Sequence, residues 1–186
     1  RADFAPWSGL WHAAPGGWSP MPGHGHQDVG GFELHFGTEP VIVDAGRGAY
    51  GESPEAAFYA GGRAHNTVLI DGVDPYPPNR PYYDDAWRRR MGEAAPALER
   101  RAAGIDLVHH GFARLGGVGG LRRAWRFAGE GVHITDRLDG TARRTVSRIL
   151  HTVLDPEQTS EGVVLKGKTR SFRIRAEGQL RVRPGH

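Results

Sequence analysis

Two histidines separated by one residue, His24 and His26, lie in the glycine-containing segment Gly23–Asp28. In an extended segment, side chains at positions i and i+2 point to the same side. Glycine beside them leaves room for a ligand or a metal ion to approach the backbone. The pattern indicates a site in which imidazole side chains bind a metal ion or transfer protons.

A carboxylate and a third histidine stand next to two apolar runs. The run Val41–Val43 ends in Asp44, and His65 precedes the run Thr67–Ile70. Because both runs are strand candidates, their ends can bring these side chains together on a rigid frame. Two imidazoles and one carboxylate suit Zn²⁺, with a fourth position left open or filled by water.

Other families with a His-x-His motif do not match this sequence. A metallo-β-lactamase requires His-x-His-x-Asp-His, and the last of these positions is Val29 here. A cupin requires a glutamate shortly after the second histidine, where this chain has Gly31. An amidohydrolase needs a (β/α)₈ barrel, which a chain of 186 residues rich in strand candidates does not fit.

The remaining histidines give weaker signals. Five lie in strand patterns, where surface positions or satisfied core positions are expected: His35, His109, His110, His133 and His151. His12 and His186 carry no signal for a site.

Short segments with alternating apolar and polar residues predict half-buried strands. The predicted strands are Phe32–Phe36, Val41–Asp44, Thr67–Ile70, Asp106–Leu115, Leu121–Phe127, Val132–Leu138, Thr145–Val153, Gly162–Lys168 and Ser171–Ala176. The 28 glycines and 13 prolines, which are spread along the chain, supply the turns between them.

One short helix is predicted at Ser53–Tyr59, because Ser53 suits the N-cap and Pro54 the first helical position. The first thirty residues and the proline-rich segment Pro75–Pro81 are expected to be irregular. Strands do not alternate with long helices, which argues against a doubly wound fold. The sequence predicts a single all-β domain over residues 1–186, an antiparallel β-sandwich with little helix.

Composition narrows the classes of partner. The chain has no cysteine, which excludes disulfides and thiolate metal sites, and no run approaches the roughly 20 apolar residues that insert into a membrane. Residues 120–186 hold 14 Lys/Arg and 7 Asp/Glu, so this half could attract a polyanion. The pI of about 9.6 admits nucleic acid, but no binding motif accompanies it, so nucleic acid is not expected as a partner.

An ordered series of motifs resembles one family. The series is Gly23–Asp28, Phe32–Leu34, Val43–Gly46, Tyr50–Gly51, Ala64–Val68 and Asp71–Gly72. Its order and spacing are similar to the heparinase II/III-like domain of polysaccharide lyases, whose architecture some alginate lyases share. The later segments Leu121–Phe127 and Thr135–Leu138 are similar more loosely.

The resemblance implies a role for each residue of the histidine cluster. His24 falls on the histidine at the family's catalytic centre. His26, Asp44 and His65 fall on the residues that hold a zinc ion, which is structural for the active site. The expected cofactor is therefore Zn²⁺.

Four further residues near His65 complete the expected site. Tyr50 and Tyr59 are both candidates for the family's catalytic tyrosine. Arg63 and Asn66, on either side of His65, are expected to bind substrate.

The activity that the resemblance implies is β-elimination on an acidic polysaccharide that contains uronic acid, such as a glycosaminoglycan or alginate. A base removes the proton α to the carboxylate, and the glycosidic bond breaks to leave an unsaturated sugar. We expect this domain to be part of a larger lyase, in which an α/α-toroid domain supplies the groups that neutralise the substrate carboxylate. Relatives are commonly periplasmic or secreted, and the same location is expected here.

Two other functions stay open at this point. One is a non-catalytic carbohydrate-binding or interaction module that retains a structural metal site. The other is a metal-dependent hydrolase of an unrelated type. Zinc content and an assay for unsaturated uronate products separate the three functions.

Overall fold

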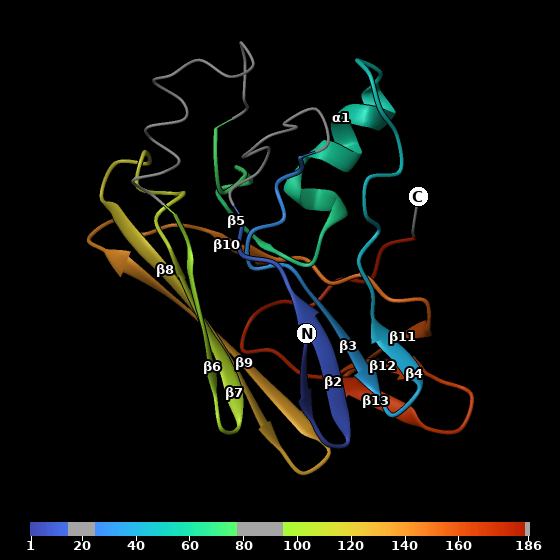
Figure 1. The fold of residues 1–186 in the computed structure, drawn as a ribbon. Coiled ribbons are helices and arrows are strands. Elements are labelled where there is room, and N and C mark those ends of the chain that lie inside the picture. Colours follow the sequence, from blue (N-terminus) through green and yellow to red (C-terminus); the bar gives the residue numbers. More distant parts are fainter. Residues whose placement is uncertain (15–24, 78–94, 185–186) are drawn as a thin grey trace.

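The computed structural model describes residues 1–14, 25–77 and 95–184, and nearly all regular structure in these ranges is β-sheet. The strands form four antiparallel sheets, with the orders β1-β2-β3-β4, β6-β7-β8-β9, β10-β5 and β11-β12-β13 (Figure 1). Their bounds are β1 Ala2–Phe4, β2 Trp7–Trp11, β3 Phe32–Phe36, β4 Glu39–Ile42, β5 Val68–Ile70, β6 Ala97–Arg101, β7 Gly104–His109, β8 Val118–Ala128, β9 Gly131–Gly140, β10 Val146–Arg148, β11 Asp155–Thr159, β12 Gly162–Lys166 and β13 Ser171–Ile174. The predicted all-β fold class is confirmed.

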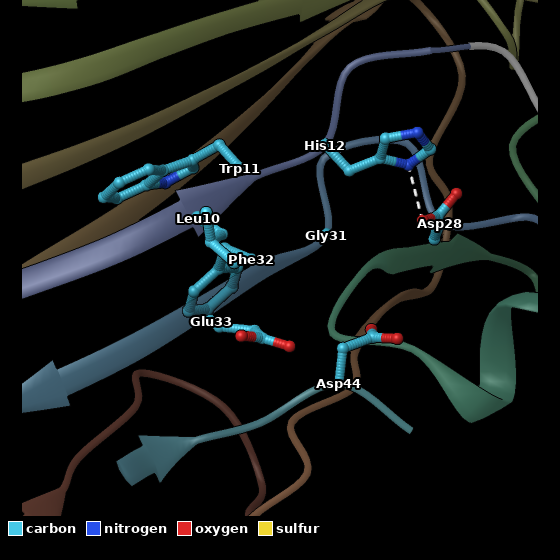
Figure 2. Close-up of a pocket in the computed structure, with 8 residues that line it drawn as sticks. All are labelled: Leu10, Trp11, His12, Asp28, Gly31, Phe32, Glu33 and Asp44. Carbon is cyan, nitrogen blue, oxygen red and sulfur yellow. Dashed lines mark ion pairs between the residues drawn. The ribbon is translucent and has the colours of Figure 1, made fainter. Parts of the chain in front are cut away.

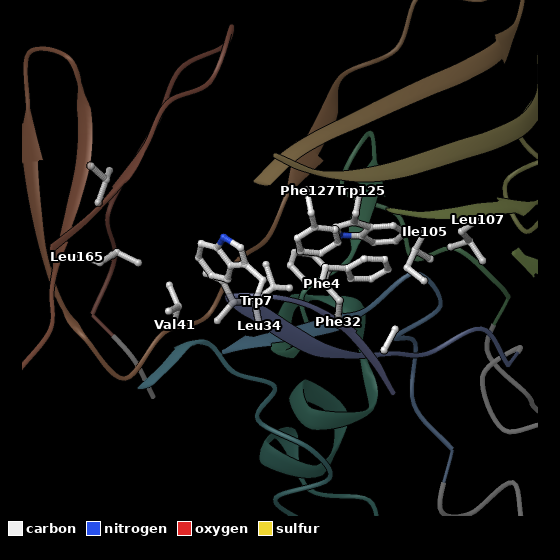
Figure 3. Close-up of a cluster of buried hydrophobic side chains, with 13 residues drawn as sticks. Phe4, Trp7, Phe32, Leu34, Val41, Ile105, Leu107, Trp125, Phe127 and Leu165 are labelled. Carbon is white, nitrogen blue, oxygen red and sulfur yellow. The ribbon is translucent and has the colours of Figure 1, made fainter. Parts of the chain in front are cut away.

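The main core lies between the sheet β1–β4 and the sheet β6–β9. Phe4 from the first sheet stacks on Phe127 from the second, with ring centroids 4.3 Å apart, and Phe32 meets Trp125 edge to face (Figure 3). The alternation predicted for the segment 32–36 puts Phe32 and Leu34 into this core, at 2% and 3% exposure. The two sheets therefore form the β-sandwich that the sequence predicted.

The C-terminal sheet β11–β13 extends the same core. Val163 and Leu165 on β12 are buried in one cluster with Val41 and Ile42 on β4 (Figure 3). Because strands far apart in the chain share this cluster, its formation fixes the end of β4, after which Asp44 follows.

The N-terminal residues are more regular than expected. The prediction that the first thirty residues are irregular is wrong for β1 and β2, which pair with each other and with β3. The strand β2 was not predicted because it contains Gly9, and a glycine inside a segment weakens a strand prediction. Glycine is required there, since a Cβ at Gly9 would collide with the carbonyl oxygen of Glu33 and the ring of Trp11.

Two edge strands, β6 and β11, also escaped prediction. All five residues of β6 are exposed, so the strand has no apolar face to produce an alternating pattern. β11 contains Pro156, which is tolerated at a sheet edge. Both strands are held by backbone pairing to one neighbour, β7 or β12.

The predicted strand Thr145–Val153 forms a ladder only over β10, and the predicted strand Asp106–Leu115 ends with β7 at His109. The residues that follow β10 form single backbone hydrogen bonds instead of a ladder. The Ile149 N–H donates to the Thr67 carbonyl oxygen, and the His151 carbonyl oxygen accepts from the Val43 N–H. This segment thus borders the predicted site.

The predicted helix is confirmed as α1, Pro54–Ala60, with Ser53 as its N-cap. The Ser53 hydroxyl accepts a hydrogen bond from the Ala56 N–H at 3.1 Å. A 3₁₀ turn, η2 (Gly62–Ala64), follows, and His65 is the residue directly after it. Among the described residues, none of the helices is long and apolar enough to cross a membrane.

His109, at the end of β7, is a buried histidine that carries no charge. It is 1% exposed, and its Nδ1 accepts a hydrogen bond from the Gly111 N–H at 3.3 Å. Burial lowers the pKa of His109 to about 3, with a smaller effect from the neighbouring Arg123 charge. It is a satisfied core residue, one of the two positions expected for it.

We expect His109 to make the protein sensitive to mild acid. Between about pH 6.5 and pH 3 the unfolded chain binds one proton more than the folded protein at this residue, so the free energy of unfolding falls by about 1.4 kcal/mol for each pH unit lost. Urea unfolding at a series of pH values should show a shallower acid loss for His109→Gln. Parallel curves for the two proteins would contradict this assignment.

Candidate functional site

Two of the predicted metal ligands, His65 and Asp44, are in direct contact. His65 is completely buried, and its Nδ1 lies 2.9 Å from Oδ1 of Asp44. The other ring nitrogen, Nε2, lies 3.0 Å from the carbonyl oxygen of Tyr59. Because a carboxylate and a carbonyl only accept hydrogen bonds, both ring nitrogens of His65 donate in this arrangement.

The third predicted ligand, His26, stacks on His65. The two ring centroids are 4.4 Å apart and the planes differ by 19°. Nδ1 of His26 lies 3.2 Å from Oδ2 of Asp28, although the angle of this contact falls short of a hydrogen bond. The structure therefore brings together all three residues predicted from the sequence as a zinc set.

Three consecutive buried polar residues, His65, Asn66 and Thr67, position this cluster, and we call them the buried polar triplet. The Asn66 amide donates to the carbonyl oxygens of Phe32 and Val43 at 2.8 and 2.9 Å. Its oxygen accepts from the His151 N–H at 2.6 Å. The Thr67 hydroxyl donates to the Val29 carbonyl, also at 2.6 Å.

A buried arginine supports the triplet from the second sheet. Arg123 on β8 donates to the carbonyl oxygens of Gly30 and Asn66 at 3.1 and 3.2 Å. Its charge faces Asp136, with Nε and Oδ1 3.1 Å apart and both side chains about 1% exposed. The loop that carries His26 is therefore tied to the sandwich as well as to the triplet.

Asn66 has a different position from the one expected of a substrate ligand. The side chain is completely buried, and both its amide nitrogen and its oxygen are used by backbone groups. Substrate cannot reach it without unfolding this region, so its role is to join the segments around the site. Arg63 is exposed, and its backbone carbonyl oxygen lies 3.1 Å from Nε2 of His151.

The tyrosine candidates lie on different parts of the site. Tyr59, near the end of α1, places its ring against the backbone of Gly48, where a Cβ would collide with it. Tyr50 is 58% exposed, and the guanidinium of Arg47 lies 5.3 Å from its ring centroid. His24 lies outside the described residues, so its predicted catalytic position stays a prediction.

A shallow pocket of about 200 Å³ borders the cluster on the side of the sheet β1–β4. Figure 2 shows its polar lining, which consists of three carboxylates and one imidazole: Asp28, Glu33, Asp44 and His12. His12, which carried no signal in the sequence, forms an ion pair with Asp28 at 2.5 Å. Only pairing of β2 with β3 brings His12 here, and that pairing could not be read from the local sequence.

The carboxylates of the cluster are held in the ionised form. Burial alone would raise the pKa of Asp28, but contacts with His12 and His26 outweigh it and lower this pKa to about 2. Burial likewise opposes the charge on Asp44, and the hydrogen bond from His65 outweighs it, so the Asp44 pKa is also lowered. The pKa values of His12 and His65 are raised because these carboxylates overcome the effect of burial.

The cluster fits zinc in donor type, and one pair of its donor atoms is close together. Two ligand atoms of a tetrahedral zinc lie roughly 3.3 Å apart for bond lengths of about 2.0–2.1 Å, and His65 Nδ1 and Asp44 Oδ1 are 2.9 Å apart. Over residues 1–14, 25–77 and 95–184, no three His, Cys, Asp or Glu side chains are already arranged to hold a metal ion. Zinc would therefore replace the direct contact between His65 and Asp44.

Most basic side chains of the Arg-rich half are already paired with carboxylates. Ten of its 14 Lys and Arg residues form ion pairs: Arg122, Arg123, Arg126, Arg137, Arg144, Arg148, Lys166, Arg170, Arg173 and Arg175. The excess of positive charge in this half is therefore less available to a polyanion than the sequence suggested.

An all-β sandwich that gathers histidines and carboxylates at one end of a sheet is the class of domain that the fold and the site define. A model of the family described as heparinase II/III-like, C-terminal, matches residues 7–186. The chain belongs to this family, as the resemblance of its motifs predicted. A comparison with curated proteins finds no match.

Removing the Asn66 side chain should cost much of the stability of the domain. Asn66→Ala removes the side-chain partner of three backbone groups, in one buried and two partly buried hydrogen bonds, and we expect the free energy of unfolding to fall by about 3–5 kcal/mol. Thr67→Val removes one such hydrogen bond and should cost about 1 kcal/mol, which makes it a matched control. Equal losses for the two variants in denaturant unfolding would contradict the role assigned to Asn66.

Proposed function

We propose that this domain forms part of the active centre of a polysaccharide lyase that cleaves uronic-acid-containing polysaccharides by β-elimination. The observation that carries the proposal is the contact of His65 with Asp44 and His26 in a chain that belongs to the heparinase II/III-like C-terminal family. Glycosaminoglycans and alginate are the substrate classes to test first.

Zinc is the proposed resident metal, held by His26, Asp44 and His65. These residues lie on three separate segments: the loop before β3, the residues that follow β4 and the residue that follows η2. Zinc would supply a firm link between the segments and so hold His26, two positions after His24 in the sequence. The role of the chain's own residues is to keep the three ligands together.

The proton transfers are assigned to His24 with Tyr59 or Tyr50. β-Elimination needs a base for the proton α to the carboxylate and an acid for the leaving glycosidic oxygen. Tyr59 is the first of the two to test, because its backbone carbonyl oxygen contacts His65 and so keeps this residue beside the cluster. Arg63, which is exposed beside the cluster, is proposed to contact the substrate.

Neutralisation of the substrate carboxylate is assigned to another domain of the protein. The side chains that line the pocket include three carboxylates, Asp28, Glu33 and Asp44, whose negative charge would repel a uronate carboxylate. The proton to be removed is acidic enough only when that carboxylate is neutralised. An α/α-toroid domain in the same protein is the proposed source, and a periplasmic or secreted location is proposed with it.

The activity is tested on the full-length protein that contains this domain. Heparin, heparan sulfate, chondroitin and alginate are offered in turn, and absorbance of the unsaturated uronate is recorded. We expect one of these classes to give product and His24→Ala to lower kcat at least about 100-fold. His133→Ala, on β9 in the second sheet, should leave the rate unchanged.

If none of the four polymers gives product, the lyase proposal is contradicted. The remaining function would then be a non-catalytic carbohydrate-binding module. Full activity of His24→Ala would contradict the proton-transfer role alone.

The zinc proposal is tested separately by metal analysis. We expect one zinc per chain in the wild type, loss of that zinc in His26→Ala, and a lower melting temperature for the variant, because metal binding contributes to folding free energy. His133→Ala should keep its zinc. A wild type without zinc, or a His26→Ala variant with unchanged metal content and melting temperature, would overturn the assignment.

A further inference from the structure

Asp28 is the one acidic residue of the Gly23–Asp28 motif, and the proposed zinc set does not use it. It is 6% exposed, and its Oδ2 lies 2.5 Å from Nδ1 of His12 and 3.2 Å from Nδ1 of His26. A single buried carboxylate oxygen thus faces the ring nitrogens of two histidines. Nδ1 of His26 has no other polar partner among the described residues.

The backbone holds Asp28 in place. The Gly31 N–H donates to the Asp28 carbonyl oxygen at 2.6 Å, and His12 exchanges backbone hydrogen bonds with Gly30 and Gly31 at 2.9 Å. A Cβ at Gly31 would collide with the Asp28 carbonyl oxygen, so only glycine allows this turn. The main chain at Asp28 is therefore fixed, and the contact with His12 restrains the carboxylate itself.

A neutral imidazole carries its proton on one ring nitrogen and a lone pair on the other. An ionised carboxylate beside Nδ1 favours the proton there, which leaves Nε2 as the nitrogen that can bind a metal. We propose that Asp28 is a positioning residue that fixes the Nδ1-protonated form and the ring orientation of His26. This inference rests on the zinc site proposed above.

His12 is the second contact of the same carboxylate. Its side chain is 44% exposed, whereas that of Asp28 is 8% exposed. His12 therefore contacts Asp28 from the more exposed side, and its ring also lies close to that of His26, with centroids 6.2 Å apart. His12 and His26 thus share one carboxylate oxygen of Asp28, and only His26 belongs to the proposed zinc set.

The first experiment measures zinc affinity of the full-length protein by competition with a chelator. We expect Asp28→Ala to weaken zinc binding about 10–100-fold, and Asp28→Asn, which keeps an oxygen acceptor, to recover part of the loss. Glu33→Ala is the matched control, because Glu33 lines the same pocket and has no ion pair with a histidine among the described residues. It should change zinc affinity less than about 3-fold.

The second experiment needs no zinc. Nitrogen-15 NMR of the metal-free wild type should show His26 protonated on Nδ1, and Asp28→Ala should shift the ring toward the Nε2-protonated form. If Asp28→Ala fails to fold, the wild-type spectrum alone still shows which ring nitrogen of His26 carries the proton.

The outcomes separate this inference from the proposed function. A wild type that binds no zinc overturns the zinc site and this inference with it. A wild type that binds zinc, with Asp28→Ala no weaker than Glu33→Ala, overturns the positioning role alone. Protonation of wild-type His26 on Nε2 overturns it as well.

Discussion

The buried polar triplet of His65, Asn66 and Thr67 is the constraint on which the arrangement of the site depends. Each residue is at most 1% exposed, and each forms hydrogen bonds to segments far away in the sequence. Burying polar groups is favourable only when they have partners, so the segments must come to the triplet for the fold to be stable. Formation of the fold and assembly of the site are thus one event.

The core explains why these segments lie within reach of the triplet. Phe32 and Val41 are buried in the cluster between the sheets, and they carry the start of β3 and the end of β4 to the same place. Arg123 then connects Asn66 to the sheet β6–β9. The site histidines and carboxylates lie just beyond the strand ends, where loops can carry chemistry on a rigid frame.

The sequence predicted the elements that have a clear pattern. β3 matched its predicted bounds because Phe32 and Leu34 alternate with polar residues, and α1 matched closely because Ser53 and Pro54 mark its start. β6 and β11 were missed because edge strands depend on backbone pairing with a neighbour, which leaves no local apolar pattern. Fold class therefore followed from the sequence better than the full set of strands.

The site was predictable in part, for physical reasons. The types and order of His26, Asp44 and His65 were visible in the sequence, and the structure places them together. The roles of His12 and Asn66 depend on long-range pairing, so no local signal could reveal them. The excess of positive charge in residues 120–186 suggested a surface that could attract a polyanion. The sequence could not show that much of this charge is paired, because ion pairs such as Arg126 with Asp106 form only after folding.

X-ray absorption at the zinc edge, on the zinc-loaded full-length protein, tests most directly whether the triplet assembles a metal centre from three segments. The account predicts two imidazole nitrogens and a carboxylate oxygen around zinc at about 2.0–2.2 Å. A shell of oxygen ligands alone, or one with a single imidazole, would contradict it.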